Sequence, residues 1–249
     1  MKHQIGIIVL LVLFKMGYAQ ELSKENQKLV KTFVLSIKKV DVNKLKSLVV
    51  YPLKRDYPLS DIKNEQEFQS RYSELFDEKL KKIITESDPT KDWSTVGMSG
   101  IMLNNGIIWL NSEGKLIAVN YKSTEELNVR DAIVEKDRSS VHKSLSDFAK
   151  PAYLLETKRF KLRVDEMKDG QYRYASWSSD KEMTYKPDLV LTNGQRIYDG
   201  SGGNHYYHFK NGIYTYEIYV FVIGEKQTPT AELNVYKNKT KIVHEPAIT

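Results

Sequence analysis

Hydrophobic residues in the first half of the chain recur at helical spacing. The first such pattern predicts a helix over residues 23–39, because its apolar positions are three or four residues apart and share one side of a helix. These positions are Leu29, Val30, Phe33, Val34 and Ile37. Similar patterns predict helices after Asp41, after Asn64 and around residues 80–84. Asp41 and Asn64 are residue types that cap helix N-termini, and Glu67 completes a capping-box-like pattern with Asn64.

From Trp93 onward the period changes to short runs bounded by turn residues. The runs IMLN, IIWLN and KLIAVNY are separated by Asn105–Gly106 and Glu113–Gly114. An Asn-Gly pair supplies the positive φ angles of a tight hairpin, so the pattern predicts an antiparallel meander of at least three strands. Residues 20–122 are therefore expected to form an α+β domain, with helices on a curved antiparallel sheet.

A mostly polar helix is predicted next. Ser123 and Glu126 form a second capping-box pattern, and the apolar positions that follow are few. Helices with so little apolar surface commonly connect domains. We expect residues 123–150 to be a linker.

The remaining residues, 151–249, have the alternating pattern of strands. Phe160, Leu162 and Val164 alternate with Lys161 and Arg163, which predicts one buried and one solvated face. Further strands are expected, one of them running from residue 214 to residue 223. Turns are expected at residues 169–170, 193–194, 211–212 and 224–229. About seven short strands in a hundred residues predict a β-sandwich or a small barrel.

Residues 1–19 have the pattern of a secretory signal peptide. Lys2 precedes the apolar run 5–14, and Gly17 and Ala19 are small residues at the third and first positions before the expected cleavage site. Such a short run cannot span roughly 30 Å of hydrocarbon, so a retained membrane anchor is the weaker alternative. We expect an exported chain, periplasmic or secreted, that begins near Gln20 without stable membrane insertion.

Composition and charge exclude several classes of protein. The 249 residues include no Cys, which removes disulfides, thiol nucleophiles and Cys-ligated metals. Loss of the leader leaves 36 basic and 32 acidic residues, a net charge of +4 in place of +6, with the two signs interleaved. Nucleic-acid binding is therefore not expected, because it requires cations concentrated on one face. We expect no cofactor.

The N-terminal domain resembles the nuclear transport factor 2-like cone fold. The resemblance rests on the order of elements: helices, a short extended piece before Pro52, a further helix pair, and then hairpins. The hairpin residues that carry it are Trp93, Gly100, Gly106, Trp109 and Gly114. Such cones commonly enclose an apolar pocket, which here would be lined by Tyr72, Trp93, Trp109 and Tyr121. Plain core packing is the alternative role for these aromatic residues.

A glycine-rich loop precedes one of the C-terminal strands. It comprises Gly200, Ser201, Gly202, Gly203, Asn204, His205 and Tyr206. Glycines allow a loop to approach another molecule closely and to present its polar side chains, although a simple chain reversal would also use them. The loop resembles that of periplasmic lysozyme inhibitors, in which a Ser- and Gly-rich loop enters the cleft of a glycosidase. The resemblance implies a lysozyme-like or other envelope protein as partner.

Metal binding and catalysis are poorly supported by the sequence. His205 and His208 are three residues apart on a predicted strand, so they face opposite sides and cannot chelate one metal. Ser201 and His205 lack an evident orienting acid, unless Asp199 or Asp188 lies nearby in space. We therefore expect an exported, non-enzymatic binding protein, in its most concrete form an inhibitor of, or immunity factor against, a cell-wall-degrading enzyme. One alternative is a small-ligand-binding protein or an enzyme using the aromatic pocket of the N-terminal domain. Another is a structural envelope module with no dedicated target.

Overall fold

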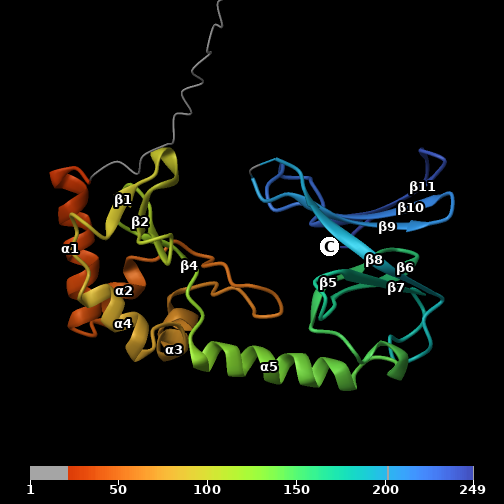
Figure 1. The fold of residues 1–249 in the computed structure, drawn as a ribbon, viewed down its shortest axis with the longest axis horizontal. Coiled ribbons are helices and arrows are strands. Elements are labelled where there is room, and N and C mark those ends of the chain that lie inside the picture. Colours follow the sequence, from red (N-terminus) through yellow and green to blue (C-terminus); the bar gives the residue numbers. More distant parts are fainter. Residues whose placement is uncertain (1–21, 201, 249) are drawn as a thin grey trace, which may run out of the picture. The chain divides into compact units, whose positions relative to one another are not determined.

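The computed structural model of the chain describes residues 22–200 and 202–248, and its fold is α+β with two antiparallel sheets (Figure 1). The expected signal peptide lies outside the described residues. The chain forms two compact units. Of the described residues, unit 1 contains those up to Leu53 together with Lys63–Ser123, and unit 2 contains Lys54–Ile62 together with those from Thr124 onward.

Unit 1 combines four helices with a small four-stranded sheet. The helices are α1 (Lys24–Lys38), α2 (Val42–Ser47), α3 (Glu65–Leu75) and α4 (Glu78–Thr85). The strands are β1 (Trp93–Thr95), β2 (Ile101–Leu103), β3 (Ile108–Leu110) and β4 (Leu116–Val119), with a short 3-10 helix, η1 (Gly97–Ser99), after β1. The sheet is a meander in the order β1-β2-β3-β4, as the turn residues predict.

Side-chain caps define where these four helices begin. Ser23, Asp41, Asn64 and Asp77 each accept a hydrogen bond from a backbone N–H in the first turn, at donor–acceptor distances of 2.8 to 3.1 Å. Each bond satisfies an N–H group that has no partner within the helix, and is worth about 1 kcal/mol. The caps expected at Asp41 and Asn64 are confirmed.

The core of unit 1 joins α1 to the sheet. The ring of Phe33 on α1 packs edge-on against Trp93 on β1, with a centroid distance of 6.3 Å. Gly114, in the β3–β4 turn, lies so close to α1 that a Cβ there would be 2.9 Å from the Cβ of Leu29. The extended piece before Pro52 adds to the sheet through a parallel bridge between Val49 and Leu116. Local sequence sets the helices, and these long-range contacts position them.

Unit 2 is built around one eight-stranded antiparallel sheet. Its helical elements are α5 (Thr124–Ser139) and a 3-10 helix, η2 (Lys143–Leu145). The strands are β5 (Lys150–Glu156), β6 (Phe160–Glu166), β7 (Tyr172–Ser178), β8 (Leu189–Tyr198), β9 (His205–Asn211), β10 (Tyr214–Val220), β11 (Ala231–Lys237) and β12 (Thr240–Pro246).

The eight strands neighbour one another in sequence order, and the sheet curls around a single core (Figure 1). Thr157, just after β5, forms an antiparallel bridge with Ala247, just after β12. The two outermost strands therefore approach each other at one end, as in a partly closed barrel. Of the two expected architectures, this curled sheet is closer to the small barrel than to a sandwich of two separate sheets.

The expected turn at residues 193–194 is wrong. Asn193 and Gly194 lie inside β8, at the point where the strand changes partner: residues up to Gly194 pair with β7, and residues from Gln195 pair with β9. Asn193 has a positive φ of 59°, and a Cβ on Gly194 would lie 2.1 Å from the ring of Phe209. The pair therefore makes a strand corner, not a chain reversal.

The expected solvated face of β6 is also wrong, because β6 and β7 are covered on both sides. Leu162 and Val164 belong to the core inside the curled sheet. Arg163, on the opposite face, is buried beneath a second cluster. That cluster consists of Val134, Val141, Leu145, Phe148, Ala175 and Trp177. The polar helix α5 contributes Val134 to it and so belongs to unit 2.

The start of α5 also carries an ion pair. Glu126 is buried and its carboxylate accepts hydrogen bonds from the guanidinium of Arg55, which is itself buried in the segment Lys54–Ile62. This bidentate contact explains why that segment groups with unit 2.

Candidate functional site

The glycine-rich loop connects β8 to β9. Its ends are joined by a backbone hydrogen bond of 2.8 Å from the Asp199 N–H to the Asn204 carbonyl. Gly200 and Gly203 have φ angles of 75° and 90°, which residues with a side chain rarely adopt. A Cβ on Gly202 would lie 2.2 Å from the side chain of Ile223. The backbone conformation requires glycine at positions 200 and 203, and close packing requires it at position 202. Ser201 lies outside the described residues.

Asn204 ties this loop to the loop that follows β10. Its Oδ1 accepts hydrogen bonds from the N–H groups of Val222 (2.8 Å) and Ile223 (2.9 Å), and its Nδ2 donates to the Ile223 carbonyl (3.1 Å). Val222 and Ile223 nevertheless remain 57% and 60% exposed. The sequence pattern assigns both to a strand that runs to residue 223, whereas β10 ends at Val220. Two loops at the same end of the sheet therefore form one surface with an apolar tip.

His205 and Tyr206 point to opposite faces of the sheet, as adjacent strand residues must. The His205 ring lies beside Tyr198 and Tyr207, with centroid distances of 5.8 and 5.5 Å, and its Nδ1 is 2.9 Å from the Gly203 carbonyl oxygen. Tyr206 stacks on Tyr219 of β10 with a centroid distance of 5.9 Å. The seven loop residues therefore do not all face one partner.

An aromatic and acidic cluster lies on the outer face of β9 and β10. The hydroxyl of Tyr219 donates a hydrogen bond to the carboxylate of Asp199, and the Tyr219 ring also contacts Phe221 at 4.6 Å. Hydrogen bonding to Asp199 raises the pKa of Tyr219 to about 12, because loss of the phenolic proton would place two negative charges side by side. Asp199 is thereby engaged with Tyr219.

Asp199 and Asp188, the two acids that could orient His205, each bond to other residues. Asp188 accepts a hydrogen bond of 3.0 Å from the Ser178 N–H and forms an ion pair with Lys181, and the contact with Lys181 lowers the pKa of its carboxyl. Among the residues that the structure describes, no group of three or more His, Asp or Glu side chains is arranged to hold a metal ion. These observations give no support to a Ser201–His205 catalytic pair.

Two of the aromatic residues expected to line a pocket in unit 1 are core residues. Trp93 is buried against Phe33, and its Nε1 donates to the Ser87 Oγ at 2.9 Å. Tyr72 is buried and stacks on Phe76 at 5.2 Å. Burial raises the pKa of Tyr72 to about 12. Core packing accounts for the positions of both rings.

The other two aromatic residues are partly exposed and lie elsewhere in unit 1. The indole of Trp109, on β3, covers Gly106, where a Cβ would be 2.8 Å from the indole nitrogen. The hydroxyl of Tyr121 donates to the carboxylate of Asp77 at 3.0 Å. Each of the four rings thus has a different set of neighbours, and their common pocket stays a prediction.

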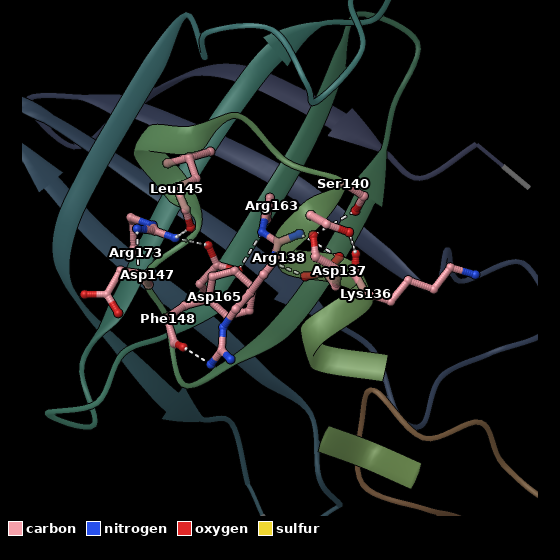
Figure 2. A network of polar contacts seen from close by, with 11 residues as sticks. Lys136, Asp137, Arg138, Ser140, Leu145, Asp147, Phe148, Arg163, Asp165 and Arg173 are labelled. Atoms are coloured by element: carbon pink, nitrogen blue, oxygen red, sulfur yellow. Dashed lines mark hydrogen bonds and ion pairs between the residues drawn. The ribbon is translucent and has the colours of Figure 1, made fainter. Parts of the chain in front are cut away.

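A buried charge network that the sequence analysis does not identify holds α5 and the following residues onto the sheet (Figure 2). The Arg163 Nε lies 2.6 Å from the Asp165 Oδ1, and its Nη1 lies 3.0 Å from the Asp137 Oδ1 on α5. Asp165 also accepts from Arg173 at 2.7 Å. The Arg163 guanidinium further stacks on Phe148 at 4.7 Å. Two arginines and two aspartates balance in charge, which is the condition for burying such groups.

No helix in the described part of the chain is both long and apolar enough to span a membrane. No protein-family model, curated protein or solved structure matches the chain.

Proposed function

We propose that this chain is an exported, non-enzymatic binding protein whose contact surface is the pair of loops 199–204 and 221–230. The observation that carries the proposal is the three hydrogen bonds of Asn204, which fix the tips of two neighbouring loops together. Loops held on a rigid sheet are the usual place for a recognition surface. The exposed side chains of Val222 and Ile223 would supply its apolar centre, which a partner would cover.

The partner that we propose is a cell-wall-degrading enzyme of the lysozyme type, which the chain would inhibit or neutralise. The catalytic cleft of such an enzyme contains a pair of carboxyl groups. A Ser201 hydroxyl and a His205 imidazole entering that cleft would hydrogen-bond to them. The resemblance of residues 200–206 to the loop of periplasmic lysozyme inhibitors supports this choice, as does the export expected from residues 1–19.

The finer architecture is part of the same proposal. We propose that unit 1 is a nuclear transport factor 2-like cone, since four helices precede a four-stranded antiparallel meander in the expected order. In this proposal unit 1 is not an enzyme, and the core contacts of Trp93 and Tyr72 favour that choice.

The test is to measure binding of the purified chain to a panel of lysozymes and to peptidoglycan, with inhibition of cell-wall lysis followed in parallel. Ile223→Ser removes the apolar tip. Its matched control is Ile213→Ser, because Ile213 is 52% exposed in the β9–β10 turn at the opposite end of the strands. Ser201→Ala and His205→Ala test the two polar groups.

The proposal expects tight binding to at least one lysozyme, lost in the Ile223 variant and retained in the Ile213 variant. Loss of binding in the Ser201 and His205 variants would establish entry of the loop into the cleft. Absence of binding to all lysozymes, or equal loss in the two isoleucine variants, would remove the basis for the proposal.

A further inference from the structure

Four lysines form a straight stripe along one side of α1. They are Lys24, Lys28, Lys31 and Lys38, and Leu35 lies in the same row between the last two. Residues at these spacings share one face of a helix, because a helix has 3.6 residues per turn. At a rise of 1.5 Å per residue the lysine stripe is about 21 Å long. All five residues are exposed.

The opposite side of α1 faces the core of unit 1. Val30, Phe33 and Ile37 are buried on that side. Phe33 contacts Trp93 of the sheet, and α1 also packs against α2 and α4 (Figure 1). The lysine stripe is therefore turned away from the core of unit 1.

No ion pair among the described residues includes a lysine of the stripe. The acids of the elements that pack against α1 have other partners. Asp41 caps α2, and Glu78 and Glu86 form ion pairs with lysines of α4. Glu25 is the one acidic residue of α1, and it lies about a quarter turn to the side of the stripe. This face of α1 therefore has a local excess of positive charge, although the two signs are interleaved along the chain as a whole.

A hollow of about 290 Å³ lies at the C-terminal end of the stripe. Its lining includes Lys38, Val40, Glu78, Lys81 and Lys82. Three lysines and one glutamate are its charged residues, which gives the lining a net charge of +2. Val40 is 55% exposed. The hollow thus combines positive charge with an exposed apolar side chain.

The exposed apolar side chains indicate which anionic partner fits this face. A soluble polyanion would be attracted by the lysines alone and would leave Leu35, which is 51% exposed, in water. A bilayer with anionic headgroups attracts lysines at its surface, and the boundary between headgroups and acyl chains buries apolar side chains that lie among them. Lysines flanking such a residue can pack their apolar stems and keep the ammonium groups among the headgroups.

We propose that the lysine stripe binds the surface of a bilayer that contains anionic phospholipid. In this arrangement α1 lies parallel to the surface, Leu35 is buried between the headgroups, and the hollow beside Lys38 receives one lipid phosphate. The contact is peripheral. The stripe belongs to unit 1, whereas the loops 199–204 and 221–230 belong to unit 2, so the inference does not rest on the binding of an enzyme.

Co-sedimentation with vesicles tests the partner class. The purified chain is used without residues 1–19, because their apolar run would bind bilayers by itself and every contact described above begins at residue 22 or later. Vesicles of phosphatidylglycerol and phosphatidylcholine in equal parts are compared with vesicles of phosphatidylcholine alone. We expect at least about a hundredfold tighter binding to the anionic vesicles, from roughly fivefold per lysine. This preference should disappear in about 1 M salt, where the screening length falls to about 3 Å.

A double variant tests the lysines. Lys28→Gln combined with Lys31→Gln removes two charges from the stripe, and glutamine has a helix propensity close to that of lysine. We expect it to weaken binding to the anionic vesicles by about tenfold to thirtyfold. Lys158→Gln combined with Lys186→Gln is the matched control, because both are exposed lysines of unit 2, and it should bind as the parent chain does.

Leu35→Gln distinguishes a bilayer from a soluble polyanion. It should weaken binding to the anionic vesicles by about threefold to tenfold, because the leucine side chain is no longer available for burial. Binding to soluble polyphosphate should not change. Val129→Gln is the matched control, because Val129 is a 41% exposed apolar residue on α5.

The proposal is overturned if the chain binds neither kind of vesicle, binds both alike, or loses the same amount in the stripe variant and its control. Unchanged vesicle binding in Leu35→Gln would also overturn it, since the face would then be one for a soluble polyanion. Equal thermal midpoints of the variants and the parent chain show that the comparison concerns binding and not folding. Vesicle binding without lysozyme binding would reject the enzyme partner alone, and the reverse result would reject the α1 surface alone.

Discussion

Arg163 and Asp165, two residues apart on β6, form an ion pair in which both side chains are buried: the exposed fraction of the arginine side chain is 1% and that of the aspartate is 0%. Residues at this spacing share a face of a strand. The face they occupy lies beneath α5 and the residues that follow it, where Asp137 and Arg173 complete the network (Figure 2). The pair is therefore part of how α5 attaches to the sheet.

The first prediction concerns removal of one buried charge. Asp165→Ala leaves Arg163 and Arg173 buried without their shared carboxylate, so we expect the free energy of unfolding to fall by about 3–5 kcal/mol. Urea denaturation measures this change. Asp147→Ala is the control, because Asp147 and Lys168 form an ion pair in which both side chains are exposed, and its removal should barely move the urea midpoint. Similar midpoints for the two variants would contradict a structural role for the network.

The helix starts could be predicted from sequence because capping is local. Asn64 and Glu67 are three residues apart, and the cap they predict is the hydrogen bond from the Glu67 N–H to the Asn64 Oδ1 at 2.9 Å. The burial of Arg163 could not be predicted in this way. Its position in an alternating strand indicates a solvated face, and its partner Asp137 lies 26 residues earlier in the chain.

In the candidate site, too, the local features could be predicted from the sequence and the long-range contacts could not. Glycines at 200, 202 and 203 mark a special loop from sequence alone, and their conformations and close contacts agree with that. The loop that accompanies it could not be foreseen, because the hydrogen bonds of Asn204 reach residues 18 and 19 positions later.

The corner in β8 gives the second prediction. Gly194→Ala places a methyl group 2.1 Å from the Phe209 ring, so the ring or the strand must shift, and we expect a loss of about 1–3 kcal/mol of stability. The loss should be smaller when Phe209 is already Leu, because the smaller side chain leaves room. A double-mutant cycle with Gly194→Ala and Phe209→Leu measures this coupling by denaturation. Purely additive effects would show that contact with Phe209 is not what requires glycine here.

The third prediction tests the junction between the two loops. Asn204→Ala removes the acceptor of the Val222 and Ile223 amides, and we expect both to exchange with solvent roughly three- to tenfold faster. Hydrogen exchange followed by NMR reports each amide separately. Asn204→Asp keeps an oxygen at the acceptor position and should preserve most of the protection. If both variants exchange as the parent chain does, the side chain of Asn204 does not hold the loops together.

The last prediction follows from the buried phenol of Tyr207. Burial raises its pKa to about 12 in the folded chain, although the nearby Arg196 guanidinium acts in the opposite direction, whereas a tyrosine in the unfolded chain has a pKa of about 10. Between about pH 10 and about pH 12 the unfolded state therefore binds fewer protons than the folded state. Stability is fully present below about pH 10 and falls as the pH rises through this window, by on the order of 1–3 kcal/mol for this group.

Tyr207→Phe removes that proton linkage, so the loss of stability across the window should be smaller in this variant than in the parent chain. Urea denaturation at several pH values from neutral to about pH 12 measures it. Tyr185→Phe is the control. Tyr185 is 64% exposed, so this substitution removes a hydroxyl without altering the core. An unchanged alkaline slope in Tyr207→Phe would mean that the Tyr207 hydroxyl ionises as readily in the folded chain as in the unfolded chain, and that its burial does not contribute to the pH dependence of stability.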